Sequence, residues 1–139
     1  MKQRARTAHL ALLTLFAVGC SPSSYLDKIE AEYDEIADMV CGCLPSDQQT
    51  QCQELSSSPY ALFGRDCLED ALNKDKKASR KTLKCTLDQA KKYKSCVEEK
   101  LRCEDPASYQ ACEVPDSDAC PQLPAEVETA IAACFSDAI

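Results

Sequence analysis

Cys41-Gly42-Cys43 is the one short motif in this sequence whose side chains could do chemistry. Two thiols separated by a single residue can form a redox pair, or can share a Cu(I) or zinc ion, because thiolates are soft ligands. The motif follows an acidic segment at the expected C-terminus of a helix, where the helix dipole disfavours a thiolate. The sequence therefore favours a structural interpretation, in which Cys41 and Cys43 form disulfides with different neighbours. Thiol-redox or soft-metal chemistry at these two residues is the alternative.

Other catalytic groups are scarce. The only histidine, His9, lies in an N-terminal segment that we expect to be removed, and imidazole is the commonest general base and a frequent zinc ligand. The sequence contains no G-x-S-x-G, no H-E-x-x-H, no phosphate-binding Gly-rich loop and no dinucleotide fingerprint. We therefore expect a protein that is not an enzyme, binds no cofactor and has no metal site.

The first 19 residues have the features of a secretory signal. Lys2, Arg4 and Arg6 supply positive charge, and the apolar run 10–18 is too short to span a bilayer. The chain has 11 cysteines among 139 residues. In a protein exported to an oxidising compartment, so many cysteines indicate a disulfide framework. We interpret residues 1–19 as a signal peptide that precedes a single domain.

The signal ends in Ala17-Val18-Gly19-Cys20, which resembles the lipobox of bacterial lipoproteins. The resemblance implies cleavage before Cys20, attachment of lipid to its thiol, and acylation of the new amine by a fatty acid such as palmitate. In lipoproteins that stay in the inner membrane, the residue after the lipidated cysteine is typically Asp. This chain has Ser21 at that position, so the resemblance implies sorting to the outer membrane. In the alternative interpretation the signal is an ordinary one, and the Cys20 thiol is free or disulfide-bonded. Without Cys20 the chain has ten cysteines, an even number that can pair completely.

The rest of the chain predicts an all-α fold. Residues 20–24 would form a short lipid-anchored tether, and residues 25–139 a single disulfide-rich helical domain. Apolar residues recur every three or four positions between Leu26 and Val40, which predicts a helix over 25–41 with Ser24 as its N-cap. No segment alternates apolar and polar residues as a half-buried strand does. Shorter helices are expected from Ser46 to about Leu55, from Pro59 to about Leu72, from Pro106 to Cys112 and from Glu126 to Phe135. Residues 73–77 are expected to form a turn, with a frayed continuation of the preceding helix as the alternative.

The longest expected helix covers residues 79–103 and contains neither Gly nor Pro. At about 100° per residue, Cys85, Cys96 and Cys103 share one face of this helix. Because the opposite face is apolar, the helix should contact neighbours on two sides, at the centre of a disulfide-stapled array of helical hairpins. The apolar face consists of Leu83, Leu87, Ala90, Val97 and Leu101.

Charge is unevenly distributed along the chain. Residues 74–102 contain 11 of the 16 Lys and Arg against four acidic residues, and the segments on both sides are acidic. Loss of the three cations in residues 1–19 changes the formal net charge from −7 to −10. The sequence favours a basic helix that packs between acidic helices. The alternative is that part of its basic face binds an anionic surface such as lipopolysaccharide, DNA or an acidic polysaccharide, although no motif predicts sequence-specific nucleic-acid binding.

The ten cysteines after Cys20 are predicted to form five disulfides. A turn near Lys76 lies nine residues from both Cys67 and Cys85, so these two would face each other across an antiparallel hairpin. The same hairpin, continued outward, predicts a nested order of pairs. In this order either Cys43 or Cys41 would lie opposite Cys103, and Cys43 is preferred. The predicted pairs are Cys67–Cys85, Cys52–Cys96 and Cys43–Cys103, with Cys41, Cys112, Cys120 and Cys134 pairing among themselves.

As a whole, the sequence resembles small, cysteine-rich, helical lipoproteins of Gram-negative bacteria. The resemblance implies a protein held in the cell envelope by lipid on Cys20, in the outer membrane, and facing either the periplasm or the cell surface. It implies no particular molecular activity. A structural or interaction role is therefore the expected function, with an anionic envelope polymer or another envelope protein as the partner.

Overall fold

The computed structural model describes residues 21–56, 60 and 64–136, with side chains up to Cys134. The expected signal peptide and Cys20 lie outside the described residues. The described chain is all-α, as predicted, and its only β feature is an isolated bridge between Arg102 and Asp105. Its helices are α1 (Pro22–Gly42), α2 (Ser46–Leu55), α3 (Arg65–Asn73), α4 (Lys76–Lys100) and α5 (Ala125–Ser136), with short 3₁₀ helices η1 (Pro106–Ala111) and η2 (Ser117–Ala119) between α4 and α5.

Helix α1 begins three residues earlier than predicted. Ser21, rather than Ser24, is its N-cap, and the Ser21 hydroxyl oxygen accepts a hydrogen bond from the backbone N–H of Ser24 at 3.3 Å. Pro22 occupies the first helical position, where its fixed φ suits a helix and its missing N–H costs nothing. Its side chain is buried. Residues 22–24, predicted as part of a tether, therefore form the first turn of the folded domain.

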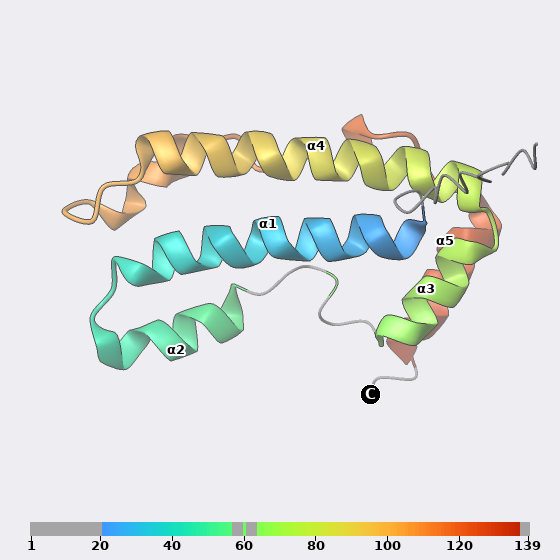
Figure 1. The fold of residues 1–139 in the computed structure, drawn as a ribbon, viewed down its shortest axis with the longest axis horizontal. Coiled ribbons are helices and arrows are strands. Elements are labelled where there is room, and N and C mark those ends of the chain that lie inside the picture. Colours follow the sequence, from blue (N-terminus) through green and yellow to red (C-terminus); the bar gives the residue numbers. More distant parts are fainter. Residues whose placement is uncertain (1–20, 57–59, 61–63, 137–139) are drawn as a thin grey trace, which may run out of the picture.

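Helices α1 and α4 lie side by side and run in the same direction (Figure 1). Near their N-termini, Leu26 and Ile29 share a core cluster with Leu83 and Leu87. Further along, Ile36 of α1 belongs to the same cluster as Val97 of α4. The predicted apolar face of α4 is correct, because Leu83, Leu87, Ala90 and Val97 are buried and Leu101 is half-buried.

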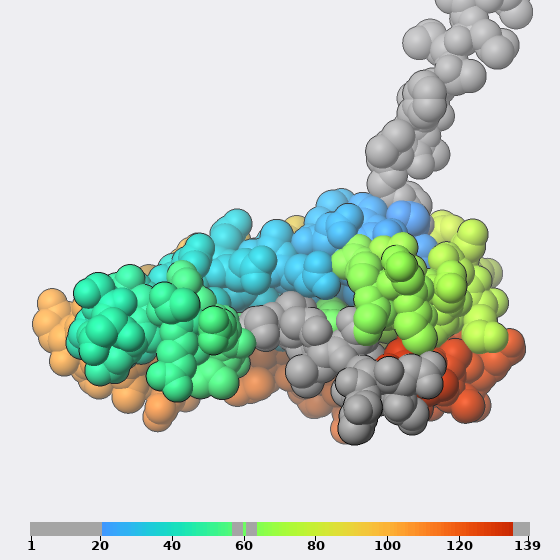
Figure 2. All heavy atoms as spheres, turned by 90° about the horizontal axis from the view of Figure 1, so that it is seen from below, coloured from blue at the N-terminus to red at the C-terminus, as the bar shows by residue number. Residues whose placement is uncertain are grey.

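The shorter helices cover the two ends of this pair. Helix α2 folds back along the C-terminal half of α1, whereas α3 and α5 pack against each other across the N-terminal end (Figures 1 and 2). Leu68 and Leu72 of α3 and Val127 of α5 complete the core cluster there. Tyr60 lies in a turn, so the helix expected from Pro59 starts only at Arg65, although Ser58 and Pro59 themselves lie outside the described residues.

The segment 103–124, which we call the strap, runs back along the cysteine face of α4. It contains η1 and η2, and two disulfides fasten it, Cys96–Cys112 and Cys85–Cys120. Helix α4 ends at Lys100, so Cys103 lies beyond the helix rather than on its face. A turn precedes α4, as predicted, but it covers only residues 74–75 instead of 73–77, and α4 begins at Lys76 instead of Ser79. The helix starts earlier because the carboxylate of Asp75 caps it by accepting hydrogen bonds from the N–H groups of Lys77 and Ala78.

All ten described cysteines form disulfides, with Cα–Cα distances of 4.8 to 5.8 Å. Of the predicted pairs, only Cys43–Cys103 is correct. The antiparallel hairpin was wrong because α1, not α3, packs along α4, which leaves Cys67 facing α5. The pairs Cys67–Cys85 and Cys52–Cys96 are therefore wrong, and the other four cysteines do not pair among themselves. The observed pairs are Cys41–Cys52, Cys43–Cys103, Cys67–Cys134, Cys85–Cys120 and Cys96–Cys112.

Candidate functional site

The expected anchor point adjoins the folded domain directly. Ser21 is the single residue between Cys20 and the first helical residue, Pro22. The neighbouring Ser23 hydroxyl donates a hydrogen bond to the Glu69 carboxylate of α3 at 2.6 Å. The first turn of α1 is therefore held on α3, and little free chain separates Cys20 from the domain.

The two cysteines of Cys41-Gly42-Cys43 are not joined to each other. Cys41, which is fully buried, bonds to Cys52 of α2, whereas Cys43 bonds to Cys103 at the start of the strap. They fasten two different neighbours to the C-terminal end of α1, as the structural interpretation predicts. Neither thiol is free to act as a redox pair or a soft-metal ligand in this disulfide-bonded state.

The outward face of α4 is a line of cations, which we call the basic face. It consists of six exposed residues that lie within an arc of about 120° at the helical repeat. None of the six forms an ion pair with a described residue, and Asp88 is the one acidic residue among them. The residues of the basic face are Lys77, Arg80, Lys81, Lys84, Lys91 and Lys92.

Only one cation of α4 joins it to another helix within the described residues. Lys94 Nζ lies 2.5 Å from Glu32 Oε2 and 2.7 Å from Glu35 Oε2 of α1. The Glu32 Oε2 atom is buried, and its described partner is the Lys94 ammonium. Contact with Glu32 and then Glu35 raises the pKa of the Lys94 ammonium above its usual value. The interpretation that basic α4 packs between acidic helices therefore holds for Lys94 and is wrong for the basic face.

A second charged cluster centres on Arg65 and joins α3 to α1. The guanidinium donates to Glu69 at 2.6 Å, to Glu30 at 2.9 Å and to Asp27 at 2.5 Å. Burial by itself would lower the pKa of Arg65, but the hydrogen bond to Glu69 and the charges of Glu30 and Asp27 together raise it. The hydrogen bond from Ser23, followed by that from Arg65, lowers the pKa of Glu69. Each of the three carboxylates forms an ion pair with Arg65, so the cluster has a structural role in joining α3 to α1.

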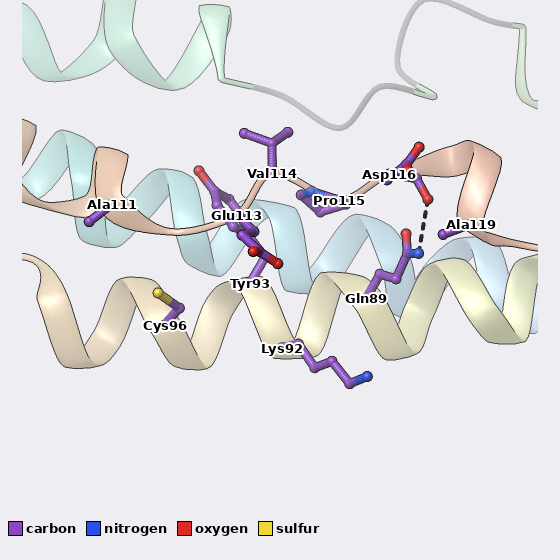
Figure 3. Close-up of a pocket in the computed structure, with 10 residues that line it drawn as sticks. All are labelled: Gln89, Lys92, Tyr93, Cys96, Ala111, Glu113, Val114, Pro115, Asp116 and Ala119. Carbon is purple, nitrogen blue, oxygen red and sulfur yellow. Dashed lines mark hydrogen bonds between the residues drawn. The ribbon is translucent and has the colours of Figure 1, made fainter.

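A hollow with a volume of about 570 Å³ lies between α4 and the strap (Figure 3). Tyr93, Pro115 and the Cys96 side chain contribute to its wall, and Gln89 closes one end by donating a hydrogen bond to the Asp116 backbone carbonyl at 2.9 Å. Lys92 points away from the strap in this view. Burial raises the pKa of Tyr93, with a further contribution from Tyr109, so the phenol stays neutral.

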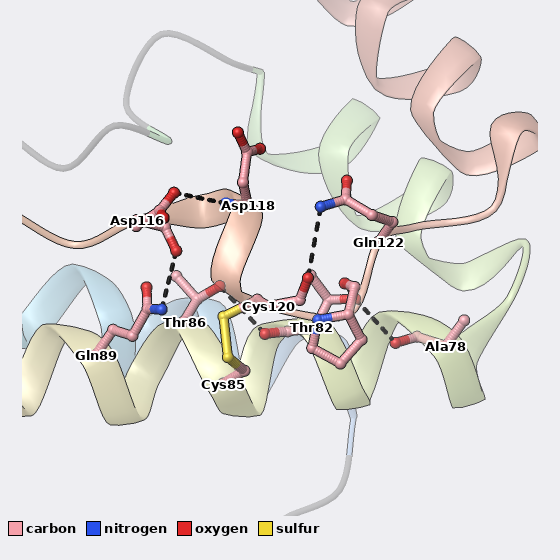
Figure 4. The surroundings of a disulfide bond; sticks show 10 residues. Ala78, Thr82, Cys85, Thr86, Gln89, Asp116, Asp118, Cys120 and Gln122 are labelled. Carbon is pink, nitrogen blue, oxygen red and sulfur yellow. Dashed lines mark hydrogen bonds between the residues drawn. A yellow bond between two sulfur atoms is a disulfide. The ribbon is translucent and has the colours of Figure 1, made fainter.

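The strap is fastened to α4 by hydrogen bonds as well as disulfides (Figure 4). Beside Cys85–Cys120, the Thr82 hydroxyl donates to the Pro121 carbonyl at 2.7 Å. Before Cys120 in the strap, the Asp116 carboxylate accepts a hydrogen bond from the backbone N–H of Asp118 at 2.9 Å and so caps η2. These contacts hold the strap on the cysteine face and leave the basic face of α4 uncovered by it.

The described residues contain neither a candidate metal site nor a helix that could span a membrane. No group of three or more His, Cys, Asp and Glu side chains there is arranged to hold a metal ion. No helix in the described ranges has the length and apolar character needed to cross a membrane.

Comparisons of the whole chain with protein-family models, curated proteins and solved structures gave no match. The residues themselves must therefore carry the functional inference.

Proposed function

We propose that this protein is a lipid-anchored protein of the cell envelope, held in the outer membrane through Cys20, with a structural or interaction role rather than a catalytic one. One observation carries the proposal: the five disulfides use every cysteine after Cys20. Cys20 then has no cysteine left for an intramolecular disulfide, and it directly follows the small residues that resemble a lipobox. Complete pairing also fits an oxidising compartment outside the cytoplasm.

The start of α1 sets how far the domain can stand from the membrane. Because Ser21 alone separates Cys20 from Pro22, the anchor spans about 7 Å at full extension. A single acyl chain binds a membrane only weakly, whereas the multiple chains implied by the lipobox resemblance anchor stably. The proposed protein therefore sits against the membrane surface and presents a rigid, cross-linked helical body to the envelope.

A Cys20→Ser variant tests the anchor. The variant should remain as uncleaved precursor or leave the membrane fraction, and it should lose the mass of the lipid. Substitution of the exposed Ser46, which lies in the folded domain, serves as a control for handling and expression; Ser46→Ala should fractionate like the wild type. If Cys20→Ser fractionates with the membrane and migrates like the wild type, the anchor proposal is wrong.

Mass spectrometry without reduction tests the structural role against the redox alternative. The mature protein should contain five closed disulfides and no thiol that reacts with an alkylating reagent. Protein isolated from cells with free thiols at Cys41 and Cys43 would instead favour thiol-redox or soft-metal chemistry at that pair.

A further inference from the structure

Within the part of the chain that the structure describes, the six cations of the basic face form no ion pair. Lys77 and Lys81 are four residues apart on the helix, as are Arg80 and Lys84, and like charges at this spacing destabilise a helix. No described carboxylate pairs with these four side chains. Folding therefore brings cations together on an exposed surface without compensating them, which indicates a ligand of opposite charge.

The dimensions of the basic face restrict that ligand. From Lys77 to Lys92 the helix rises about 22 Å, so the cations form a narrow line rather than a broad patch. They stand on an α-helix that the strap contacts on one side and α1 on another, with the line itself exposed. A long, thin polyanion can follow this line and meet successive side chains.

We propose that the basic face binds a linear polyanion, meaning an extended envelope polymer that carries phosphate or carboxylate groups at short intervals. The proposal rests on the envelope location proposed above, because the location supplies the polymer. Lysine ammonium groups and the Arg80 guanidinium pair with either kind of anion. Side-chain recognition of this kind depends on charge and spacing rather than on a closed pocket.

A flat anionic membrane fits the same face less well. The mature chain carries a formal net charge of −10, after removal of the three cations in residues 1–19 from the total of −7. A charged plane approaches the whole molecule and is repelled by this excess of acidic residues. A thin polymer can instead lie along α4 alone, where six exposed cations surround the single carboxylate of Asp88.

Binding can be measured with the chain 21–139 without lipid, because every described helix and all five disulfides lie within it. The probes are polyphosphate, polygalacturonate and vesicles that contain phosphatidylglycerol. Both polymers should bind, and affinity should fall at least about tenfold between 50 and 200 mM salt, because binding releases counterions.

Two triple variants with the same change in charge locate the binding surface. Lys77→Gln/Lys81→Gln/Lys84→Gln removes half of the cations of the basic face, and polymer affinity should fall at least about tenfold at low salt. The control exchanges three exposed lysines elsewhere on the molecule and should change affinity less than about threefold. Both variants should keep the wild-type circular dichroism spectrum, because all six side chains are exposed. The control is Lys28→Gln/Lys74→Gln/Lys100→Gln.

Equal losses in the two variants, or no polymer binding at 50 mM salt, would overturn the proposal. Binding to the vesicles but to neither polymer would also overturn it and would point to the membrane surface instead. These measurements use chain that lacks Cys20, so they do not depend on lipidation. A failed anchor in the Cys20→Ser test and a failed polymer interaction can therefore be told apart.

Discussion

Removal of the Cys67–Cys134 disulfide should cost this protein much of its stability. The bond joins α3 to α5 across a sequence separation of 67 residues. In the chain-entropy account, a closed loop of that length stabilises the folded state by about 4.4 kcal/mol. Cys85–Cys120 lies inside the loop and shortens it to roughly 33 residues, which lowers the value to about 3.7 kcal/mol. We therefore expect Cys67→Ala/Cys134→Ala to lose about 4 kcal/mol, a large part of the stability of a small domain.

The matched control is Cys41→Ala/Cys52→Ala. It also removes one disulfide and one almost fully buried sulfur, but its sequence separation is only 11 residues. The same account gives about 2.8 kcal/mol for this loop. Urea unfolding of the chain 21–139, followed by circular dichroism, measures both losses as changes in the unfolding free energy.

The order of the two losses is the critical result. A loss for Cys67→Ala/Cys134→Ala that is smaller than the loss for Cys41→Ala/Cys52→Ala would refute the reasoning from loop length. Peptide mapping of the wild-type protein provides a separate check, since a peptide that joins Cys67 to Cys85 would restore the antiparallel hairpin and contradict the packing of α3 on α5.

Three further predictions concern the ion pairs and the anchor. Arg65→Met should lower the free energy of unfolding in urea by about 1–2 kcal/mol, because it leaves the partly exposed carboxylates of α1 and α3 without their shared cation. The control Arg80→Met, on the exposed basic face, should stay within about 0.5 kcal/mol of the wild type. Folding lowers the pKa of Glu69, so the folded state binds the Glu69 proton less tightly than the unfolded state does. The ionised carboxylate therefore stabilises the folded state above the unfolded pKa of about 4.3, and this contribution is lost as the pH falls through the lower folded pKa. Glu69→Gln should therefore lose less stability between pH 7 and pH 3 than the wild type, and an equal loss would contradict this assignment. Ser21→Asp retains a good N-cap, so the fold should be unchanged, but the lipoprotein resemblance predicts a shift from the outer to the inner membrane in a density gradient.

Local signals were sufficient for most helices. The spacing of Leu26, Ile29 and Ile36 predicts α1 because a helix repeats its face every three to four residues, and all three side chains are buried. The predicted start of α4 at Ser79 is three residues too late, because the Asp75 carboxylate caps the helix by accepting from its first free N–H groups. The start of α1 was misplaced because two serines are candidate caps. Pro22 is the signal that should have decided between them, since Pro favours the first helical position.

The spacing of the cysteines in α4 and in the strap also favours the two disulfides that join them. Cys85 and Cys96 are 11 residues apart on α4, a rise of about 16 Å. Cys112 and Cys120 are separated by 8 residues of loop and 3₁₀ helix, which can cover a similar distance in the opposite direction. A match of this kind favours the pairs Cys96–Cys112 and Cys85–Cys120 over the nested order.

The Cys43–Cys103 pair was predicted for the wrong physical reason. The nested hairpin required the segment before α4 to run antiparallel to it, whereas α1 runs parallel to α4. Because parallel helices end on the same side, Cys43 after the last turn of α1 and Cys103 after the last turn of α4 meet there. The pair is the same in both arrangements, and only the structure distinguishes them.

The sequence by itself determined the helices, the disulfide-rich class and the cationic side of α4, because these follow from residue types and from spacings of a few positions. Only the tertiary structure decided which helix lies beside α4, which cysteines meet, and whether the cations of α4 are used inside the molecule. Apolar faces on α1 and α3 are nearly interchangeable as partners, so local pattern cannot rank them. Their choice depends on how Leu68, Leu72 and Val127 close one shared core at the N-terminal end of α1, and that packing leaves the basic face in solvent.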